Sequence, residues 1–384
     1  MKGIFSTTTL GQINTPFYYY DTALLKATLN TVKHEADEHK YIVHYAIKAN
    51  ANPKILQIVQ QAGLGADCVS GGEIQAALAA GFPANRIVYA GVGKNDWEIN
   101  LGLDHNIYCF NVESLAELEI INELAALKNT TANVCIRVNP NIEAHTHANI
   151  TTGLAENKFG IDIGQVSSVL KQAKDLSCVH VIGLHFHIGS QISDMSVFAT
   201  LCSRINELQD ELEKIGFQAQ HINVGGGLGI DYKHPDDIPI ADFKAFFNTY
   251  TTHLKRQNNQ QVHFELGRSI VAQCGSLITK TLYIKQGVNK QFAIVDGGMN
   301  DLIRPALYQA YHKIENISSE EACEPYDVVG PICESTDVFG KAVLLNKTYR
   351  GDLIAIRSAG AYGESMASQY NCRPLAKGYF TEDL

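Results

Sequence analysis

Eight short apolar runs, rich in β-branched residues, recur along the first two thirds of the 384-residue chain, with helical periodicity between them. Most of these runs are apolar on both faces, which is typical of parallel strands covered by helices. The runs are Tyr41–Ala46, Gly65–Val69, Arg86–Ala90, Ile107–Val112, Val134–Asn139, Val181–His187, His221–Gly226 and Val262–Leu266. The helical patterns are Pro53–Ala62, Gly72–Ala80, Ser114–Lys128, Ile163–Lys174 and Met195–Ile215.

Eight strand–helix units in about 240 residues predict a TIM-type (β/α)8 barrel, which we place at residues 22–266. A doubly wound open sheet is the alternative that the pattern leaves open. After Leu266, helical patterns become scarce, and strand-like segments alternate with turns that carry Gly, Asn or Pro. These segments are Gly275–Lys285, Lys290–Asp296, Asp327–Pro331 and Asp352–Ser358. We therefore expect a C-terminal antiparallel β-sandwich or β-barrel domain at 267–384, joined by residues 1–21 with their opening run Phe17–Asp21.

The composition argues against a nucleic-acid-binding, membrane-spanning or secreted protein. The net charge is −9 and no basic run occurs, so nucleic acid is not expected as a main partner. No apolar run approaches the roughly 20 residues that span a bilayer, and the N-terminus lacks the apolar core of a secretory signal. Nine scattered cysteines without a CxxC pair argue against structural zinc and a disulfide framework, and they indicate a reducing, cytoplasmic compartment.

The carboxyl ends of the strands carry the active site in barrels of this type. Lys48 follows the first run, where desolvation would lower the pKa of its amine and favour a Schiff base. An exposed lysine that extends to the surface is the alternative. Asp67 and Glu73 follow the second run and could hold an ammonium or imine, although Ser70 and Glu73 also fit helix capping.

Later strands end in further polar groups. Side chains alternate between the two faces of a strand, so His185 and His187 lie on the same face. They could bind a metal, pack on a planar cofactor, or be core residues whose hydrogen bonds are made within the protein. No third ligand is evident, so we predict no metal site. Gly225–Gly227 follow the seventh run, the usual place of a phosphate loop in this fold. Glu265 and Arg268 follow the eighth run and supply an acid and a guanidinium.

These features together suggest one cofactor. A Schiff-base lysine, a phosphate loop, a flat ring and an acid for a pyridine nitrogen are the groups that pyridoxal 5'-phosphate requires. The acid would strengthen the cofactor as an electron sink, which favours loss of CO2 or of a proton at Cα.

With these residues in place, the chain resembles the fold type III pyridoxal-phosphate decarboxylases, the family of the diaminopimelate, ornithine and arginine decarboxylases. The resemblance covers nearly the whole chain. It rests on YAIKAN at 45–50, GADCVSGGE at 65–73, FNVES at 110–114, HFHIGSQ at 185–191, GGG at 225–227, ELGR at 265–268, CES at 333–335 and SQYN at 368–371. The diaminopimelate branch is indicated by Thr152-Gly153 with 158–160, by 300–308 and by the segment from Gly360.

The resemblance implies roles for residues of the predicted barrel. Lys48 would carry the cofactor, with Asp67 near it, His187 stacked on the pyridine ring and Glu265 paired with the ring nitrogen. The phosphate or a nearby substrate carboxylate would be held by a larger group: Ser190, Gly225, Gly226, Gly227, Gly267, Arg268 and Tyr370.

The resemblance also implies a homodimer with shared sites. Cys333 of the second subunit would return a proton to the substrate carbon, and Glu334 would bind the distal ammonium. Arg304 and Tyr308 would bind the distal carboxylate, for which the fork of an arginine is well suited. The implied reaction is decarboxylation of meso-2,6-diaminopimelate to L-lysine.

The sequence differs from the family pattern in two ways, and three other functions stay open. Leu266 stands where the family usually has Pro, and the chain is short for the diaminopimelate branch. A carboxynorspermidine or other basic amino-acid decarboxylase is one alternative, although the HFHIGSQ loop argues against the former. A catalytically silent regulator is another, against which Lys48 and Cys333 argue. A racemase would need a second acid–base group in place of Cys333.

Overall fold

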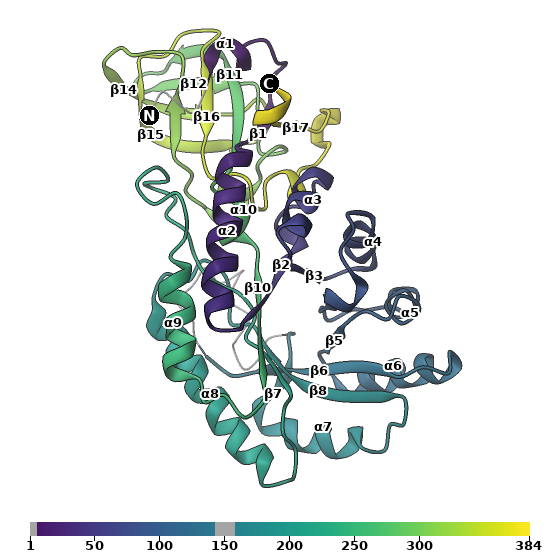
Figure 1. The fold of residues 1–384 in the computed structure, drawn as a ribbon. Coiled ribbons are helices and arrows are strands. Elements are labelled where there is room, and N and C mark those ends of the chain that lie inside the picture. Colours follow the sequence, from purple (N-terminus) through teal and green to yellow (C-terminus); the bar gives the residue numbers. More distant parts are fainter. Residues whose placement is uncertain (1–5, 143–157) are drawn as a thin grey trace. The chain divides into compact units, whose positions relative to one another are not determined.

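Eight parallel strands close into a barrel in the computed structural model, which describes residues 6–142 and 158–384 (Figure 1). The strand order is β2, β3, β4, β5, β6, β8, β9, β10, and β10 pairs with β2 to close the ring. The predicted barrel is therefore confirmed and the open sheet is wrong. The strands are β2 (Ile42–Ala46), β3 (Gly65–Cys68), β4 (Ile87–Tyr89), β5 (Cys109–Val112), β6 (Ala132–Asn139), β8 (Val179–Phe186), β9 (His221–Asn223) and β10 (Gln261–Leu266), with a short β7 (Ile161–Asp162) beside β6.

Helices follow the strands, and their first turns carry the capping residues that the sequence suggests. Ser70 accepts a hydrogen bond from the Glu73 amide, and Ser114 of the FNVES motif caps the next long helix in the same way. Pro53 lies in the first turn of its helix, where no amide donor is needed. The helices are α2 (Thr22–Glu38), α3 (Pro53–Gln61), α4 (Gly71–Ala79), α5 (Asp96–Asp104), α6 (Leu115–Leu127), α7 (Val166–Ala173), α8 (Met195–Glu213) and α9 (Phe243–His253).

The chain divides into two compact units. We call Leu29–Gly229 with Asp242–Gly267 the barrel unit, and Met1–Thr28 with Ile230–Ala241 and Arg268–Leu384 the β unit. Thr152 and Gly153, which support the family resemblance, lie outside the described residues.

The β unit contains an eight-stranded sheet with the order β13, β16, β11, β12, β14, β15; β1 pairs with β11, and β17 pairs with β1. Strand β1, which contains most of the opening run, pairs with β11 in this sheet. Most pairs are antiparallel, but β1 with β17 and β12 with β14 are parallel, so the sheet is mixed. The elements are α1 (Thr7–Leu10), β1 (Phe17–Tyr20), α10 (Arg268–Val271), β11 (Gly275–Gln286), β12 (Gln291–Val295), α11 (Arg304–Tyr308), β13 (Ile314–Asn316), β14 (Cys323–Val329), β15 (Val338–Asn346), β16 (Leu353–Ile356) and β17 (Lys377–Phe380).

Strand β10 illustrates how alternation prepares the interior of the barrel. Phe264 packs against Tyr250 of α9, with ring centroids 5.0 Å apart. His263 and Glu265 lie on the opposite face, because successive side chains of a strand point to opposite sides. Both are nearly fully buried, and both meet polar partners from other strands. One strand thus supplies apolar packing outside and polar chemistry inside.

Within residues 6–142 and 158–384, no helix combines the length and apolar character needed to cross a membrane.

Candidate active site

Lys48 and Asp67 meet at the carboxyl ends of neighbouring strands. Lys48 lies in a 3₁₀ turn directly after β2, and its Nζ is 3.3 Å from Asp67 Oδ2 at the end of β3. The Asp67 side chain is fully buried, whereas the Lys48 side chain is 37% exposed. The sequence analysis named Asp67 and Glu73 as acids that could hold this ammonium, and the structure places Asp67 beside it. Burial raises the pKa of Asp67 to about 8, an effect that Glu265 strengthens and Lys48 opposes.

Glu73, the other acid considered with Asp67, serves the backbone. Its Oε2 accepts a hydrogen bond from the Val69 amide at 2.7 Å, while its own amide donates to Ser70 Oγ. The capping interpretation therefore holds for Glu73, and Asp67 is the acid that meets Lys48.

Glu265 is held inside the barrel by three side chains from three strands. Its Oε2 lies 3.0 Å from His185 Nε2, and its Oε1 accepts from Asn111 Nδ2 at 3.2 Å and Asn223 Nδ2 at 2.7 Å. Burial alone would raise the pKa of Glu265, but His185 and the nearby Lys48 charge hold it well below its usual range. The carboxyl is thus an ionised acceptor within a fixed polar frame.

The glycine loop lies against His187. The Gly226 amide donates to His187 Nδ1 at 3.4 Å, and the loop follows β9 directly. Gly225 and Gly227 have φ of +71° and +107°, which favour glycine. A Cβ on Gly226 would lie 2.0 Å from the Glu265 carbonyl oxygen. Burial, followed by Lys48 and Arg137, lowers the pKa of His187 and keeps the ring neutral.

Gly267 brings the end of β10 close to the Lys48 turn. A Cβ at this position would lie 3.0 Å from Ala49 Cβ and 3.1 Å from Ala46 Cβ. Leu266, which replaces the family's proline, is buried as the last residue of β10 and pairs in register with Tyr45. The strand itself therefore fixes the backbone that leads to Arg268. Ser190 lies in the loop after β8.

The β unit holds a separate cationic cluster. Arg268 begins α10 and Arg304 begins α11, and both are 5% exposed. Their NH1 groups donate to one oxygen, Tyr232 Oη, at 2.6 and 2.9 Å. The Arg268 guanidinium also lies 4.9 Å from the centroid of the Tyr362 ring. Tyr308 ends α11, in the same short helix as Arg304.

Cys333, Glu334 and Tyr370 gather elsewhere in the β unit. Cys333 and Glu334 lie in the exposed turn between β14 and β15. Tyr370 Oη donates to Glu334 Oε1 at 2.5 Å, across 36 positions of sequence. The structure therefore joins two residues whose roles the resemblance gave separately.

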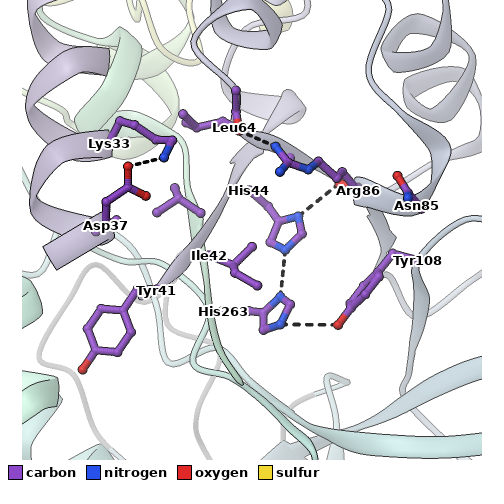
Figure 2. Close-up of a pocket in the computed structure, with 14 residues that line it drawn as sticks. Lys33, Asp37, Tyr41, Ile42, His44, Leu64, Asn85, Arg86, Tyr108 and His263 are labelled. Carbon is purple, nitrogen blue, oxygen red and sulfur yellow. Dashed lines mark hydrogen bonds and ion pairs between the residues drawn. The ribbon is translucent and has the colours of Figure 1, made fainter. Parts of the chain in front are cut away.

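A pocket of about 230 Å³ occupies the opposite, amino end of the barrel strands (Figure 2). His44 Nε2 lies 3.0 Å from His263 Nδ1, and His263 Nε2 lies 3.2 Å from His221 Nδ1, with Tyr108 Oη beside both rings. His44 Nδ1 reaches the Arg86 carbonyl at 3.2 Å. These groups satisfy one another. In the described part of the chain, no three His, Cys, Asp or Glu side chains are placed to hold a metal.

Sequence reasoning missed several residues that complete these clusters: Asn111, Asn223, Tyr232 and His312. Asn111 lies inside the quoted FNVES motif, which was its only signal. Tyr232 follows the glycine loop by five residues, in a charged segment without regular structure. The sequence around Asn111 or Tyr232 does not indicate which residue each will contact, because each partner lies tens of residues away in the chain.

A family model described as the pyridoxal binding domain of pyridoxal-dependent decarboxylases matches residues 22–272. The chain belongs to the pyridoxal-dependent decarboxylase family. A member of the family from Bacteroides thetaiotaomicron, named diaminopimelate decarboxylase, is 64% identical over the full length of both chains. A chain of this length therefore has a counterpart in the diaminopimelate branch.

Solved structures of family members agree in fold. Diaminopimelate decarboxylase from Helicobacter pylori, complexed with L-lysine, has a TM-score of 0.93 at 41% identity and covers 99% of this chain and 95% of its own. The enzyme from Methanocaldococcus jannaschii, also with L-lysine, has a TM-score of 0.91 at 37% identity, covering 99% and 90%.

The groups of the barrel unit fit the family's cofactor. Asp67 Oδ1 is buried and has no hydrogen-bond partner among the described residues, so a polar group is still needed beside it. The ionised Glu265 can accept a hydrogen bond from a protonated pyridine nitrogen. Gly225–Gly227 leave the turn after β9 free of side chains, which suits the close approach of a phosphate.

Proposed function

We propose that this protein decarboxylates meso-2,6-diaminopimelate to L-lysine and CO2 with pyridoxal 5'-phosphate. The arginine pair Arg268 and Arg304 is the observation that carries the choice of substrate. Diaminopimelate keeps a second carboxylate at the end that does not react, and two buried guanidinium groups match that charge. Ornithine and arginine have no such group. The full-length likeness to diaminopimelate decarboxylases supports the same choice.

In this proposal the barrel unit holds the cofactor. Lys48 would bind it covalently beside Asp67, and His187 would stack on its ring. Ser190, the glycine loop and Gly267 would hold its phosphate. Arg268 and Tyr370 would hold the phosphate or the nearby substrate carboxylate. When bound, pyridoxal phosphate supplies the electron sink for the bond that breaks between Cα and the carboxylate. Glu265 keeps a proton at the ring nitrogen, because its low pKa leaves it an acceptor at neutral pH.

The β unit then supplies the proton and the distal contacts. Cys333 returns a proton to the carbon that lost CO2, Glu334 binds the distal ammonium, and Arg304 with Tyr308 binds the distal carboxylate. We propose that Cys333 and Glu334 reach the site from the partner subunit of a homodimer. The exposure of both residues in one chain supports this proposal. We also keep the division into a barrel at 22–266 and a β domain of 1–21 with 267–384, and a cytoplasmic location.

The experiment is a comparison of substrates with the cofactor-loaded enzyme. CO2 release is measured from meso-diaminopimelate, ornithine, arginine and carboxynorspermidine, and L-lysine is identified as the product. We expect a clear preference for diaminopimelate, and loss of activity together with the visible colour of the bound cofactor in Lys48→Ala. Equal or greater activity with carboxynorspermidine or ornithine would overturn the assignment, and a release of label from Cα without CO2 would indicate a racemase.

A further inference from the structure

Tyr232 joins the two arginines of the β unit through one oxygen atom. Arg268 NH1 donates to Tyr232 Oη at 2.6 Å and Arg304 NH1 donates to it at 2.9 Å. Both guanidinium groups also lie near the face of the ring, 5.9 and 5.2 Å from its centroid. A phenol oxygen has two lone pairs, and here each accepts from one arginine. The hydroxyl of Tyr232 can then still donate one hydrogen bond through its own hydrogen.

The segment that carries Tyr232 is fastened to the β unit. Arg357 NH2 binds Asp236 Oδ1 at 2.7 Å, and Lys313 Nζ binds Asp236 Oδ2 at 3.2 Å. Gln273 Nε2 donates to the Ile238 carbonyl at 2.6 Å. These contacts lie four and six residues from Tyr232, so the phenol is positioned by its segment as well as by the arginines.

His312 orients Arg304 from a second side. Its Nδ1 lies 2.9 Å from the Arg357 carbonyl oxygen, which can only accept, so Nδ1 carries the hydrogen. Its Nε2 then presents a lone pair to Arg304 NH1 at 3.1 Å. Burial, followed by the charge of Arg304, lowers the pKa of His312 to about 3. The imidazole is therefore a neutral acceptor at physiological pH.

Resting on the proposed function, we propose that Tyr232 is the positioning residue that makes Arg268 and Arg304 a single receptor for the carboxylate that remains in L-lysine. Its oxygen holds the guanidinium groups at one spacing, and its O–H donates to the same carboxylate. His312 fixes Arg304 within this receptor. The ligand class is an amino acid whose unreacted end carries a carboxylate.

The test compares two ligands that differ only in that carboxylate, L-lysine and cadaverine. We expect Tyr232→Phe, which keeps the ring but removes the hydroxyl, to weaken lysine binding about 10- to 100-fold. Cadaverine binding should stay within about two-fold, since it has no carboxylate to lose contacts. Calorimetry on the cofactor-loaded enzyme measures both without turnover. In steady-state kinetics, KM for diaminopimelate should rise with little change in kcat.

Tyr250→Phe is the matched control. It makes the same chemical change at a buried tyrosine of the barrel unit whose hydroxyl has no hydrogen-bond partner in the described structure. Its lysine and cadaverine affinities should equal those of the wild type. Should Tyr232→Phe fold poorly, His312→Leu tests the same receptor by removing the second acceptor of Arg304, and it should again weaken lysine more than cadaverine.

The pH dependence gives a second readout. The groups that contact Tyr232 are Arg268 from α10, Arg304 from α11 and the neutral His312. Tyr362 lies against Arg268, and the neighbouring Asp231 binds Lys233 and His234. Burial would raise the pKa of Tyr232, but the two arginines lower it below its usual value of 10. Ionisation removes the donor and adds a negative charge, so lysine binding should weaken at alkaline pH in the wild type. Tyr232→Phe should show a smaller alkaline loss than the wild type, and what remains comes from the amino groups of lysine itself.

The role of Tyr232 and the proposed decarboxylase function can be refuted independently. Equal weakening of lysine and cadaverine, or no weakening of either, overturns the role of Tyr232. An unchanged alkaline limb in Tyr232→Phe does so as well. Failure of the wild type to release CO2 from diaminopimelate overturns the proposed function instead, while the contrast between lysine and cadaverine still reports on the receptor.

Discussion

His185 Nε2 lies 3.0 Å from Glu265 Oε2, and both side chains are nearly fully buried in the barrel. The pair comes from β8 and β10, strands that are separated by β9 and its Asn223, which binds the other oxygen of the same carboxyl. An ionised acid in a buried site is expensive unless it is hydrogen-bonded and near opposite charge. These hydrogen bonds stabilise the buried carboxylate, and they fix the direction from which Glu265 can accept a further hydrogen bond.

Removal of this charge should slow the chemical step. We expect Glu265→Gln to lower kcat by roughly 10²- to 10⁴-fold, because a neutral amide does not keep a ring nitrogen protonated. The cofactor should still bind, since Lys48 and the glycine loop are intact. Steady-state kinetics and a cofactor titration measure the two effects. Glu119→Gln on the exposed face of α6 is the control, and a kcat close to the control's would refute the role of Glu265.

Backbone crowding should make Gly226 intolerant of a side chain. A Cβ there would lie 2.0 Å from the Glu265 carbonyl oxygen, whereas a Cβ on Gly93 meets nothing within 4 Å. We expect Gly226→Ala to destabilise the fold by about 1–3 kcal/mol and to weaken cofactor binding. Gly93→Ala should do neither. Thermal unfolding and cofactor titration of both variants check this, and equal behaviour of the two would count against the predicted phosphate loop.

The histidines of Figure 2 should make the barrel acid-labile. Burial lowers the pKa of His44 from 6.5 to about 4, so the unfolded chain binds the proton more readily than the folded one. The stability that this neutral ring contributes is complete above 6.5 and is lost as the pH falls toward 4. Between about pH 7 and about pH 5, His44 alone should account for about 2 kcal/mol.

Denaturant unfolding at the two pH values measures this loss. In His44→Gln the free energy of unfolding should depend less on pH than in the wild type, by that amount. The control is His34→Gln, which alters an exposed histidine of α2. A wild-type slope in His44→Gln would show that the cluster is not the source of acid lability.

The proposed homodimer with shared sites predicts recovery of activity from two inactive variants. Lys48→Ala and Cys333→Ala should each lose nearly all activity. When equal amounts are mixed and allowed to exchange subunits, half of the dimers are mixed and each has one complete site, so about 25% of wild-type activity should return. Cys323→Ala, another exposed cysteine, serves as the control and should be fully active. No recovery after proven exchange would place Lys48 and Cys333 of one site in the same subunit.

The parts of the fold that the sequence predicted are those with local signals. The sequence predicted all eight barrel strands, because a strand that is buried on both faces has a nearly continuous apolar sequence. In the β unit, β13, β15 and β17 were missed. Strand β15 alternates buried with exposed positions irregularly, and β13 and β17 are only three and four residues long, so neither carries a clear period.

The site divides in the same way. Lys48, Asp67, Glu265 and the glycines could be predicted, because each follows a strand in the sequence and the ends of parallel strands meet. The polar frame of Glu265 could not, since Asn111 lies 154 positions from it. The sequence also left open whether Lys48 is desolvated or exposed, because the surroundings of a turn depend on what packs over it.

The sequence by itself determined the barrel, the family and the residue types of the chemistry, since these follow from periodicity and from motifs next to strand ends. Only the tertiary structure decided that the Glu73 side chain accepts from the Val69 amide, and that Tyr232 joins Arg268 to Arg304. The physical reason is that hydrogen bonds depend on distances of about 3 Å between atoms. For residues far apart in the chain, folding alone sets those distances.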